Sequence, residues 1–259
     1  MADFSMYRQT VRCLGFRGVS GILLDRLVSL NNFYILQKSL SSVAAPNPHR
    51  MQLPISKIEE KDWHEILEQA YCLDIVSRRE ILSRARFFRN DFRNCYGVRS
   101  KTGSIAHIQW IVFPEENDAI SAHYRRHFKP LEPNEIMLEN AFTFPRFRGI
   151  GLLRYATRHL LNLAGELGYK KATAYVLFEN CASLNELIPL GFSIRKVVRE
   201  YRFLGLTRRR LEERRPGRNK GVAGQWNHSR GAGAETKTGP GAPAEGKGEH
   251  QHGFYGTRA

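Results

Sequence analysis

Residues 135–168 contain a strand-like segment, a basic turn with two glycines and a helical segment in immediate succession. Polar and apolar residues alternate from Glu135 to Thr143, which predicts a strand. Apolar residues then recur at helical spacing over 152–167, and Gly168 is the kind of residue that ends a helix. We therefore expect a strand and a helix joined by one short turn, Phe144-Pro145-Arg146-Phe147-Arg148-Gly149-Ile150-Gly151.

This turn has the chemistry of an anion-binding site. Backbone N–H groups at a helix N-terminus point toward the turn, and the helix dipole adds positive charge there. Gly149 and Gly151 would let a phosphate approach the backbone closely, because glycine has no Cβ. The side chains of Arg146 and Arg148 add further positive charge. The segment therefore predicts a site for a phosphate or pyrophosphate group.

The turn departs from the two commonest phosphate loops. A P-loop carries Lys-Ser or Lys-Thr after its last glycine, whereas Leu152 and Leu153 follow here. A dinucleotide-binding fingerprint carries a third glycine, whereas Arg154 stands at that position. The remaining interpretation is the pyrophosphate loop of an acyl-CoA transferase.

The chain resembles the GNAT superfamily of N-acetyltransferases at two motifs. The family's turn has the pattern Pro-x-(Tyr/Phe)-Arg-Gly-x-Gly, and a helix of about four turns follows it. A second family motif, Asn-x-x-(Ser/Ala) with Gly-Phe further on, matches Asn180-Cys181-Ala182-Ser183 and Gly191-Phe192. A strand-like segment, Lys171 to Phe178, separates the two motifs. The resemblance is strong over 134–205 and faint over 52–133.

Two registers align the turn with the family motif. Arg146-x-x-Gly149-x-Gly151 fits its glycine pattern literally, whereas Arg148-x-x-Gly151-x-Leu153 also fits Pro145, Phe147 and the length of the helix. We prefer the second register. It places Leu153 where the family has a small residue, and that side chain would either crowd the cofactor or point into the core.

The resemblance implies a fold of the mixed α/β (α+β) class. We expect a GNAT-like central twisted sheet that is mostly antiparallel, contains one parallel pair of strands that splay apart, and is flanked by helices. The parallel pair would be Glu135 to Thr143 and Lys171 to Phe178. Composition and periodicity divide the chain into an N-terminal helical extension over 1–50, the acyltransferase domain over 51–207, and a basic, glycine-rich, disordered tail over 208–259.

The resemblance also implies transfer of an acyl group, with acetyl expected, from acyl-CoA to an amine, without a metal. The pantetheine arm would lie between the splayed strands, and a backbone N–H around Phe142 would polarise the thioester carbonyl. Asn180 would bond the pantetheine region, whereas Ser183 either contacts the cofactor or caps a helix. The residues expected to bind the cofactor are Phe142, Thr143, Arg146, Arg148, Gly149, Ile150, Gly151, Leu152, Leu153, Asn180 and Ser183.

Two carboxylates are candidates for the general base that accepts the ammonium proton. Glu139 and Glu135 lie on one face of the expected strand, where bases of the family often sit, and Glu139 is the preferred one. Both could instead be solvated side chains. Leu187 occupies the position where many family members carry a tyrosine that protonates the leaving thiolate.

Two alternatives to catalysis remain open. Leu153 and Leu187 favour a catalytically degenerate module that binds acyl-CoA or a partner without turnover. The net charge of +15 favours a surface that binds nucleic acid, an anionic membrane or another acidic partner through the basic ends of the chain. If the chain is an enzyme, the basic segment Tyr124 to Lys129 indicates an acidic or phosphorylated acceptor.

The four cysteines are scattered, and no two form a Cys-x-x-Cys pair, so neither a zinc site nor a disulfide framework is predicted. No apolar run reaches the roughly 18 residues of a membrane span, and we expect no signal peptide. These features predict a cytoplasmic protein, and the basic ends leave a peripheral position at the membrane open.

Overall fold

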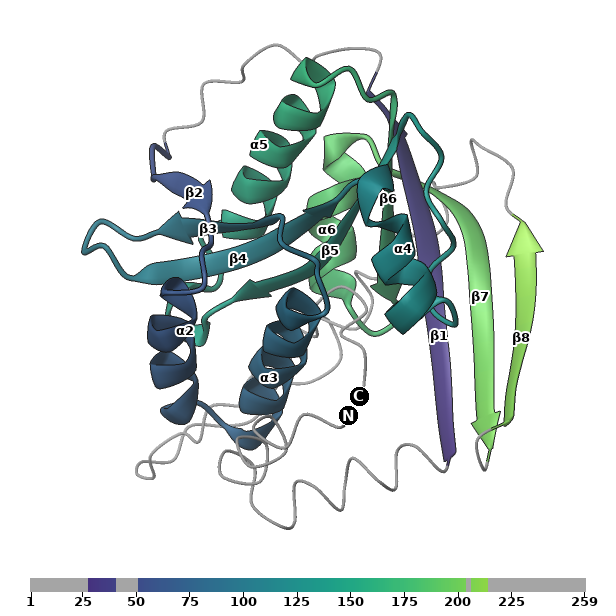
Figure 1. Cartoon of the computed structure of the whole chain (residues 1–259), viewed down its shortest axis with the longest axis horizontal. Helices are drawn as coiled ribbons and strands as arrows, with labels where there is room; N and C mark the ends of the chain where they lie inside the picture. The colour runs from purple at the N-terminus through teal and green to yellow at the C-terminus, as the bar shows by residue number, and fades with distance from the viewer. Residues whose placement is uncertain (1–27, 41–50, 204–205, 214–259) are drawn as a thin grey trace, which may run out of the picture.

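The computed structural model describes residues 28–40, 51–203 and 206–213. These residues form one eight-stranded sheet with the strand order β2-β3-β4-β5-β6-β1-β7-β8 (Figure 1). Neighbouring strands are antiparallel except β5 and β6, which are parallel. This arrangement confirms the expected fold class. The strands are β1 (Val28–Ser39), β2 (Ile55–Lys57), β3 (Cys95–Arg99), β4 (Ile105–Val112), β5 (Glu135–Thr143), β6 (Lys171–Leu177), β7 (Ser193–Phe203) and β8 (Leu206–Glu213).

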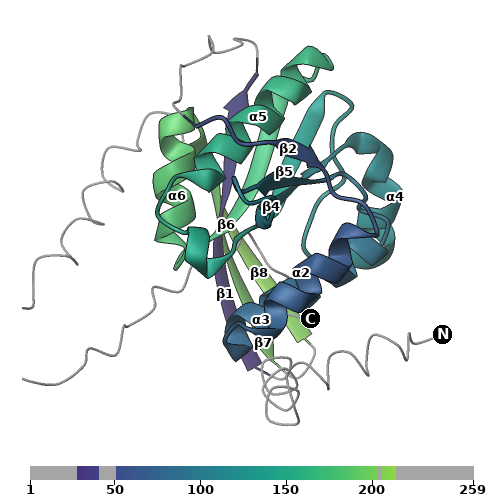
Figure 2. The same ribbon diagram turned by 90° about the vertical axis from the view of Figure 1, so that its left-hand side faces the viewer.

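Helices cover both faces of the sheet (Figure 2). One face, which we call the α3 face, carries α2 (Asp62–Tyr71), α3 (Ile75–Arg89) and α4 (Asn117–Ala119). The opposite face, the α5 face, carries α5 (Leu152–Glu166) and α6 (Cys181–Leu187). Short 3-10 or π-helical turns complete the described elements: η1 (Pro114–Glu116), η2 (Ile120–Tyr124), η3 (Pro145–Phe147) and η4 (Ile188–Leu190).

Each face of the sheet packs its own apolar core. On the α3 face, Trp110 is fully buried among aromatic side chains, and the rings of Phe87 and Phe92 stack with their centroids 4.0 Å apart. On the α5 face, Leu160 and Ala164 pack against the strands. The central strands are therefore buried on both faces.

The strand, turn and helix over residues 135–168 fold as expected. Strand β5 spans Glu135–Thr143, and α5 begins at Leu152 after the short turn. The helical segment before the β3–β4 hairpin divides into α2 and α3, because the Asp74 carboxylate accepts hydrogen bonds from the N–H groups of Val76 and Ser77. Such a cap satisfies N–H groups that lack partners inside the helix, so a new helix begins there.

The helix expected near the N-terminus is wrong for residues 28–39, which form β1. β1 lies between β6 and β7, two strands that follow each other along the chain. Its side chains enter both cores, Phe33 on the α3 face and Leu36 on the α5 face. Its apolar run, residues 33–36, is short and flanked by polar residues, and periodicity alone does not tell such a strand from a helical segment. Residues 1–27 and 41–50 lie outside the described residues.

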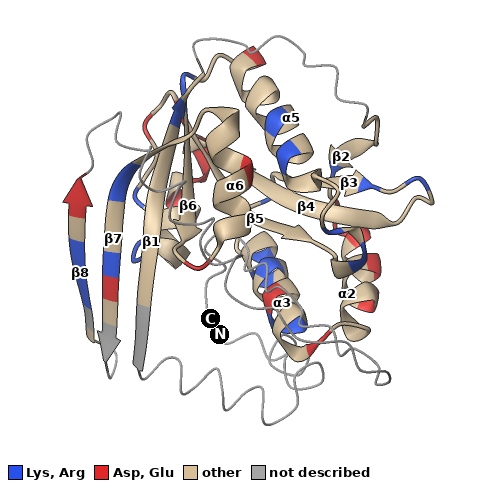
Figure 3. Cartoon of the chain, turned by 180° about the vertical axis from the view of Figure 1, so that it is seen from behind, with Lys and Arg blue, Asp and Glu red and all other residues tan. Residues whose placement is uncertain are grey.

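The disorder expected from residue 208 onward is wrong for residues 208–213, which belong to the edge strand β8. Ion pairs connect this strand to β7: Arg209 lies 2.6 Å from Glu200, and Lys196 lies 3.0 Å from Glu213. Figure 3 shows charges of both signs along the two strands. The basic segment is therefore neutralised in part by its neighbours in the sheet. Residues 214–259 lie outside the described residues.

The connection over 114–134 is more structured than its polar composition indicates. It contains η1, α4 and η2, and it buries Ile120, Tyr124 and Phe128 in the core of the α3 face. These three residues recur every four positions, a spacing that places side chains on one face of a helical segment. None of the helices in the described part of the chain is long and apolar enough to cross a membrane.

Candidate functional site

Strands β5 and β6 separate in the middle of the sheet. Their parallel ladder runs from the pair Glu135–Lys171 to the pair Leu138–Ala174 and stops there. Both strands continue, β5 as far as Thr143 and β6 as far as Leu177. The two strands therefore splay apart as the resemblance implies, and an extended ligand that lies between them could pair with their backbones.

A bulge marks the point where the strands separate. Phe142 pairs with Ile108 and Glu139 pairs with Trp110, so the two residues Asn140 and Ala141 stand opposite the single residue between Ile108 and Trp110. Asn140 has a φ of 53°, a left-handed conformation that non-glycine residues seldom adopt. A bulge bends its strand and changes the directions of its peptide groups.

Arg84 from α3 holds this bulge in place. Its side chain is fully buried, and it donates from Nε to the Asn140 carbonyl at 2.9 Å and from Nη2 to the Ala141 carbonyl at 2.8 Å. The sequence analysis missed Arg84, because a helical arginine is ordinarily exposed. The available signal was its spacing from Ile81 and Phe88, which places it on the buried face of the helix.

Glu139 is fully buried at the start of the bulge. Its Oε2 accepts a hydrogen bond from the Asn140 N–H at 2.9 Å, whereas its Oε1 is buried and has no hydrogen-bond partner among the described residues. Burial raises the pKa of this carboxyl well above its ordinary value, and the hydrogen bond from Asn140 and the charge of Arg84 offset the shift in part. Both polar atoms of the Asn140 side chain are likewise buried and unpartnered within the described ranges.

Glu135 lies at the opposite end of β5. Its carboxylate is 3.2 Å from the Lys171 ammonium, and it accepts hydrogen bonds from the Thr173 hydroxyl and from the Glu132 N–H. Thr143 is the eighth residue after Glu135, which corresponds to roughly 27 Å of extended strand. The structure therefore brings Glu139, but not Glu135, to the part of β5 that leads into the turn.

The turn after β5 presents an open, glycine-lined surface. Gly149 and Gly151 have φ angles of 81° and 83°, and a Cβ built on either would meet nothing within 4 Å. Gly151 is the N-cap of α5, and Ile150 between the two glycines is half exposed. The first N–H groups of α5 lack partners within the helix, so the turn has the geometry of an anion site.

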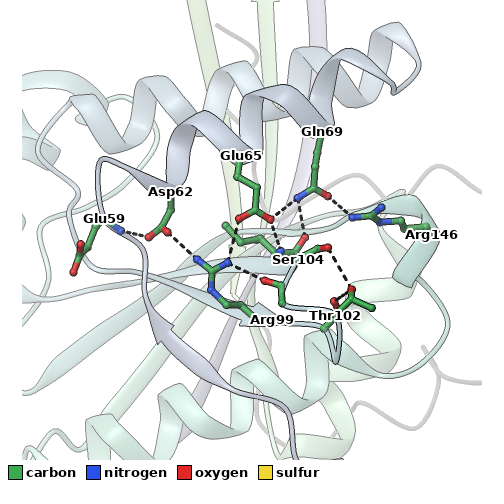
Figure 4. A network of polar contacts seen from close by, with 11 residues as sticks. Glu59, Asp62, Glu65, Gln69, Arg99, Thr102, Ser104 and Arg146 are labelled. Carbon is green, nitrogen blue, oxygen red and sulfur yellow. Dashed lines mark hydrogen bonds and ion pairs between the residues drawn. The ribbon is translucent and has the colours of Figure 1, made fainter.

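The two arginines of the turn are bound to the protein itself. Arg146 donates to the side-chain oxygen of Gln69 at 3.0 Å, and this bond continues a polar network that joins α2 to the β3–β4 hairpin (Figure 4). Arg148 is half-buried and donates from Nε to the Thr143 carbonyl at 3.1 Å. Arg148 therefore links the turn to the end of β5. The side chain of Arg146 is exposed at the surface.

His107 stabilises the end of β5 from the α5 side. Its Nδ1 is 2.8 Å from the Thr143 hydroxyl oxygen, and the ring is fully buried. Burial lowers the pKa of His107 to about 3, so the imidazole is neutral under ordinary conditions. The sequence analysis did not select this histidine, although a histidine within the apolar run of β4 was a visible signal.

The remaining predicted residues lie close to the turn and to α6. Leu152 is buried, and Leu153 packs against the core of the α5 face, so its side chain points toward the core. Asn180 is the N-cap of α6, and its side chain accepts the N–H of Ser183 at 3.0 Å. Leu187 is fully buried.

Tyr175 is a further residue at the split, the point where β5 and β6 separate. It follows the last residue of the parallel ladder and lies in the core of the α3 face, where its ring centroid is 5.1 Å from that of Phe128. Burial raises the pKa of Tyr175 to about 12, so its hydroxyl stays protonated. Among the described residues, no group of three or more His, Cys, Asp or Glu side chains could hold a metal ion.

No protein-family model and no curated protein match the chain. Solved structures match its fold. The chain is similar to a GCN5-related glucosamine N-acetyltransferase region in a fungal multi-domain GH3 β-N-acetylglucosaminidase, with a TM-score of 0.52 and 14% identity; the match covers 72% of this chain and 23% of that chain. At this identity, the likeness shows a shared fold.

Two further structures are similar to the chain. An acetyltransferase of the GNAT family from Colwellia psychrerythraea has a TM-score of 0.47 and 11% identity, and the match covers 78% of this chain and 73% of that chain. A GCN5-related N-acetyltransferase from Sphaerobacter thermophilus has a TM-score of 0.44 and 10% identity, and the match covers 76% of this chain and 57% of that chain.

Proposed function

We propose that this chain, which has the fold of the GNAT N-acetyltransferases, transfers an acyl group from acyl-CoA to an amine. The observation that carries the proposal is the arrangement along the second half of β5. A buried carboxylate with an unpartnered oxygen, Glu139, stands where β5 and β6 separate. The glycine turn follows at the end of the same strand, roughly 13 Å beyond Glu139.

Each part of acyl-CoA has a matching feature in this arrangement. Phosphates would bind the backbone N–H groups of the turn at Gly149 and Gly151, with the exposed Arg146 of the same turn as a cation beside them. The pantetheine arm would lie between the separated strands, close to Asn180. The thioester would then reach the bulge, where the N–H of Ala141, beside Phe142, would donate to its carbonyl oxygen.

The acceptor amine enters as an ammonium group, and Glu139 takes one of its protons to leave a neutral amine. The amine nitrogen then bonds to the thioester carbonyl carbon, and the carbonyl oxygen becomes an oxyanion held by the Ala141 N–H. The carbon–sulfur bond breaks, the thiolate leaves, and the nitrogen loses its second proton to solvent. Leu187 offers no acid, so the thiolate takes its proton from solvent.

The acceptor is proposed to carry negative charge. Arg125, Arg126 and Lys129 are exposed, and they belong to the segment whose Phe128 contacts Tyr175 beside the split. A screen of acceptor amines tests this assignment. We expect amines with carboxylate or phosphate groups to react fastest, and a preference for polycationic amines would contradict it.

A catalytically degenerate module that binds acyl-CoA is the second candidate. It is favoured by Leu187, which is fully buried in the core where an acid would otherwise stand. Such a module would bind acetyl-CoA and release no thiol with any amine.

The test is a thiol-release assay with acetyl-CoA and a panel of amines. We expect turnover by the full chain and a roughly 10²- to 10⁴-fold lower kcat for Glu139→Gln, the range for loss of a general base. The matched control is Glu132→Gln, which alters an exposed carboxylate of the same region. Unchanged turnover in Glu139→Gln would contradict the assignment of the base.

A further inference from the structure

We infer that Arg84 is a positioning residue that orients and polarises the backbone N–H of Ala141, the group of the bulge that would face the thioester. This inference rests on the proposed acyl transfer and deepens it. The guanidinium does not reach the reacting atoms itself, because it binds the opposite side of the same peptide group. Its effect would pass through the planar amide of the bulge.

The hydrogen bonds of Arg84 select two particular peptide groups. The carbonyl of Asn140 belongs to the amide whose N–H is that of Ala141, and the carbonyl of Ala141 belongs to the amide whose N–H is that of Phe142. Arg84 donates to these two carbonyls at 2.9 Å and 2.8 Å. The first amide is the one proposed to hold the oxyanion, because Phe142 is paired with Ile108 in the β4–β5 ladder whereas Ala141 has no partner on β4.

The direction of the N–H groups follows from the geometry of the amide. A trans peptide is planar, and its C=O and N–H bonds point in opposite directions; no cis peptide occurs in the described part of the chain. Fixing both carbonyls on the guanidinium therefore directs the N–H groups of Ala141 and Phe142 away from Arg84. The same two hydrogen bonds hold Asn140 in its left-handed conformation, with a φ of 53°.

The strength of the N–H groups follows from the charge. A charge-assisted hydrogen bond to a carbonyl oxygen polarises the amide and makes its N–H a better donor. The Arg84 side chain is fully buried, so solvent screens its charge little. Its ion pair with the carboxylate of Glu80 spans 3.4 Å, which is longer than either bond to the bulge.

Arginine is the residue type that this role needs. Its planar guanidinium presents several donors in a fixed fork and can bind two neighbouring carbonyls while Nη1 donates to the Glu80 carbonyl at 2.9 Å. Lysine is a point charge on a flexible chain and cannot reproduce the fork. The ring of Phe142 lies 5.0 Å from the guanidinium and packs against it.

The test measures the carbonyl bond directly. Acetyl-CoA labelled with ¹³C at the thioester carbonyl is bound to the full chain, and its infrared carbonyl stretch is compared with that of free acetyl-CoA. The variants are Arg84→Met, Arg84→Lys and the matched control Arg86→Met, an exposed arginine of the same helix. Thermal denaturation and the Kd for acetyl-CoA report folding and binding separately.

We expect a lowered carbonyl frequency in the wild type and in Arg86→Met, a smaller shift in Arg84→Lys and the smallest in Arg84→Met. We expect kcat to fall roughly 10- to 100-fold in Arg84→Met, less than the 10²- to 10³-fold typical of removing a donor outright, with Kd changed much less. Arg84→Lys keeps the buried positive charge, and it takes the place of Arg84→Met in the comparison if Arg84→Met does not fold.

Two results would overturn the inference. If acetyl-CoA binds folded Arg84 variants with the wild-type carbonyl frequency, Arg84 has no effect on the thioester and acts only in stability, while the proposed function stands. If the wild type does not bind acetyl-CoA, the proposed function fails first and the inference fails with it.

Discussion

Glu139 is the residue on which the proposed chemistry depends, and its environment makes it a stronger base than an exposed carboxylate. Burial opposes its ionisation and raises its pKa well above the ordinary value. A base works best when its pKa lies closer to the working pH. The same burial leaves Oε1 without a partner among the described residues, so an incoming ammonium group would supply one.

Replacing Glu139 should change the pH dependence of turnover. The carboxyl must be ionised to accept a proton, so kcat/KM of the wild type should fall as the pH drops below its raised pKa. That acid limb should lie at higher pH than for an ordinary carboxylate and should disappear in Glu139→Gln. A pH–rate profile checks both, and an unchanged acid limb in the variant would show that another group accepts the proton.

His107 should make the fold sensitive to acid. Its pKa is about 3 in the folded chain and about 6.5 when unfolded, so the unfolded state binds the extra proton between these values. The free energy of unfolding should therefore decrease by roughly a few kcal/mol as the pH drops from 6.5 toward 3. Denaturant titrations should show a weaker loss in His107→Gln than in the wild type.

The control for this titration is His123→Gln, which alters an exposed histidine. It should follow the wild type at each pH. If His107→Gln loses stability over this window as steeply as the wild type, the buried histidine is not the group that titrates.

At the residue scale, the sequence predicted the residues that belong to a motif and few others. Glu139 and the turn glycines could be predicted, because the resemblance places them by position. Arg84 and His107 could not, since their roles depend on contacts between segments far apart in the chain, α3 with β5 and β4 with β5.

At the scale of elements, the β5–turn–α5 unit was predicted almost completely. Its strand, turn and helix are determined locally by alternation, glycine and helical spacing. β1 was mispredicted because its burial on both faces depends on neighbours that only the folded sheet supplies. The separation of β5 and β6 was expected from the resemblance alone.

The two ends of α5 offer a matched pair of glycines. Gly151 and Gly168 have φ angles of 83° and 88°, and a Cβ at either would meet nothing within 4 Å. Replacing either with alanine should cost about 1–2 kcal/mol of stability through left-handed strain. Only Gly151→Ala should also weaken acyl-CoA binding.

Thermal denaturation and acetyl-CoA titration of both variants check this pair. We expect equal losses of stability in the two variants and weaker acetyl-CoA binding only in Gly151→Ala. That result would show that the loss of binding comes from the turn and not from backbone strain alone. Equal losses of binding would show that the turn has no special role.

At the scale of the whole molecule, the N-terminal strand is part of the sheet. Leu36 of β1 is fully buried between β6 and β7, whereas Leu206 at the edge is 77% exposed. Leu36→Ala should destabilise the fold by about 2–5 kcal/mol, and Leu206→Ala should change stability by less than about 0.5 kcal/mol. Urea denaturation checks both, and a neutral Leu36→Ala would contradict the place of β1 in the sheet.

The strand order itself could not be derived from the chain. Pairing of β1 with β6 and β7 joins residues more than a hundred positions apart, such as Tyr34 with Val176 and Val197. No local pattern encodes such a partner. The resemblance predicted the fold class, and the structure adds the inserted strand and the edge strand β8.

Calorimetric titration of acetyl-CoA into the full chain tests the central claim most directly. It is done with the wild type, Gly151→Asp and the matched control Gly168→Asp, which place the same carboxylate at opposite ends of α5. The account predicts one binding site per chain in the wild type and in Gly168→Asp, and its loss in Gly151→Asp. Absence of binding to the folded wild type, or equal binding by all three proteins, would contradict it.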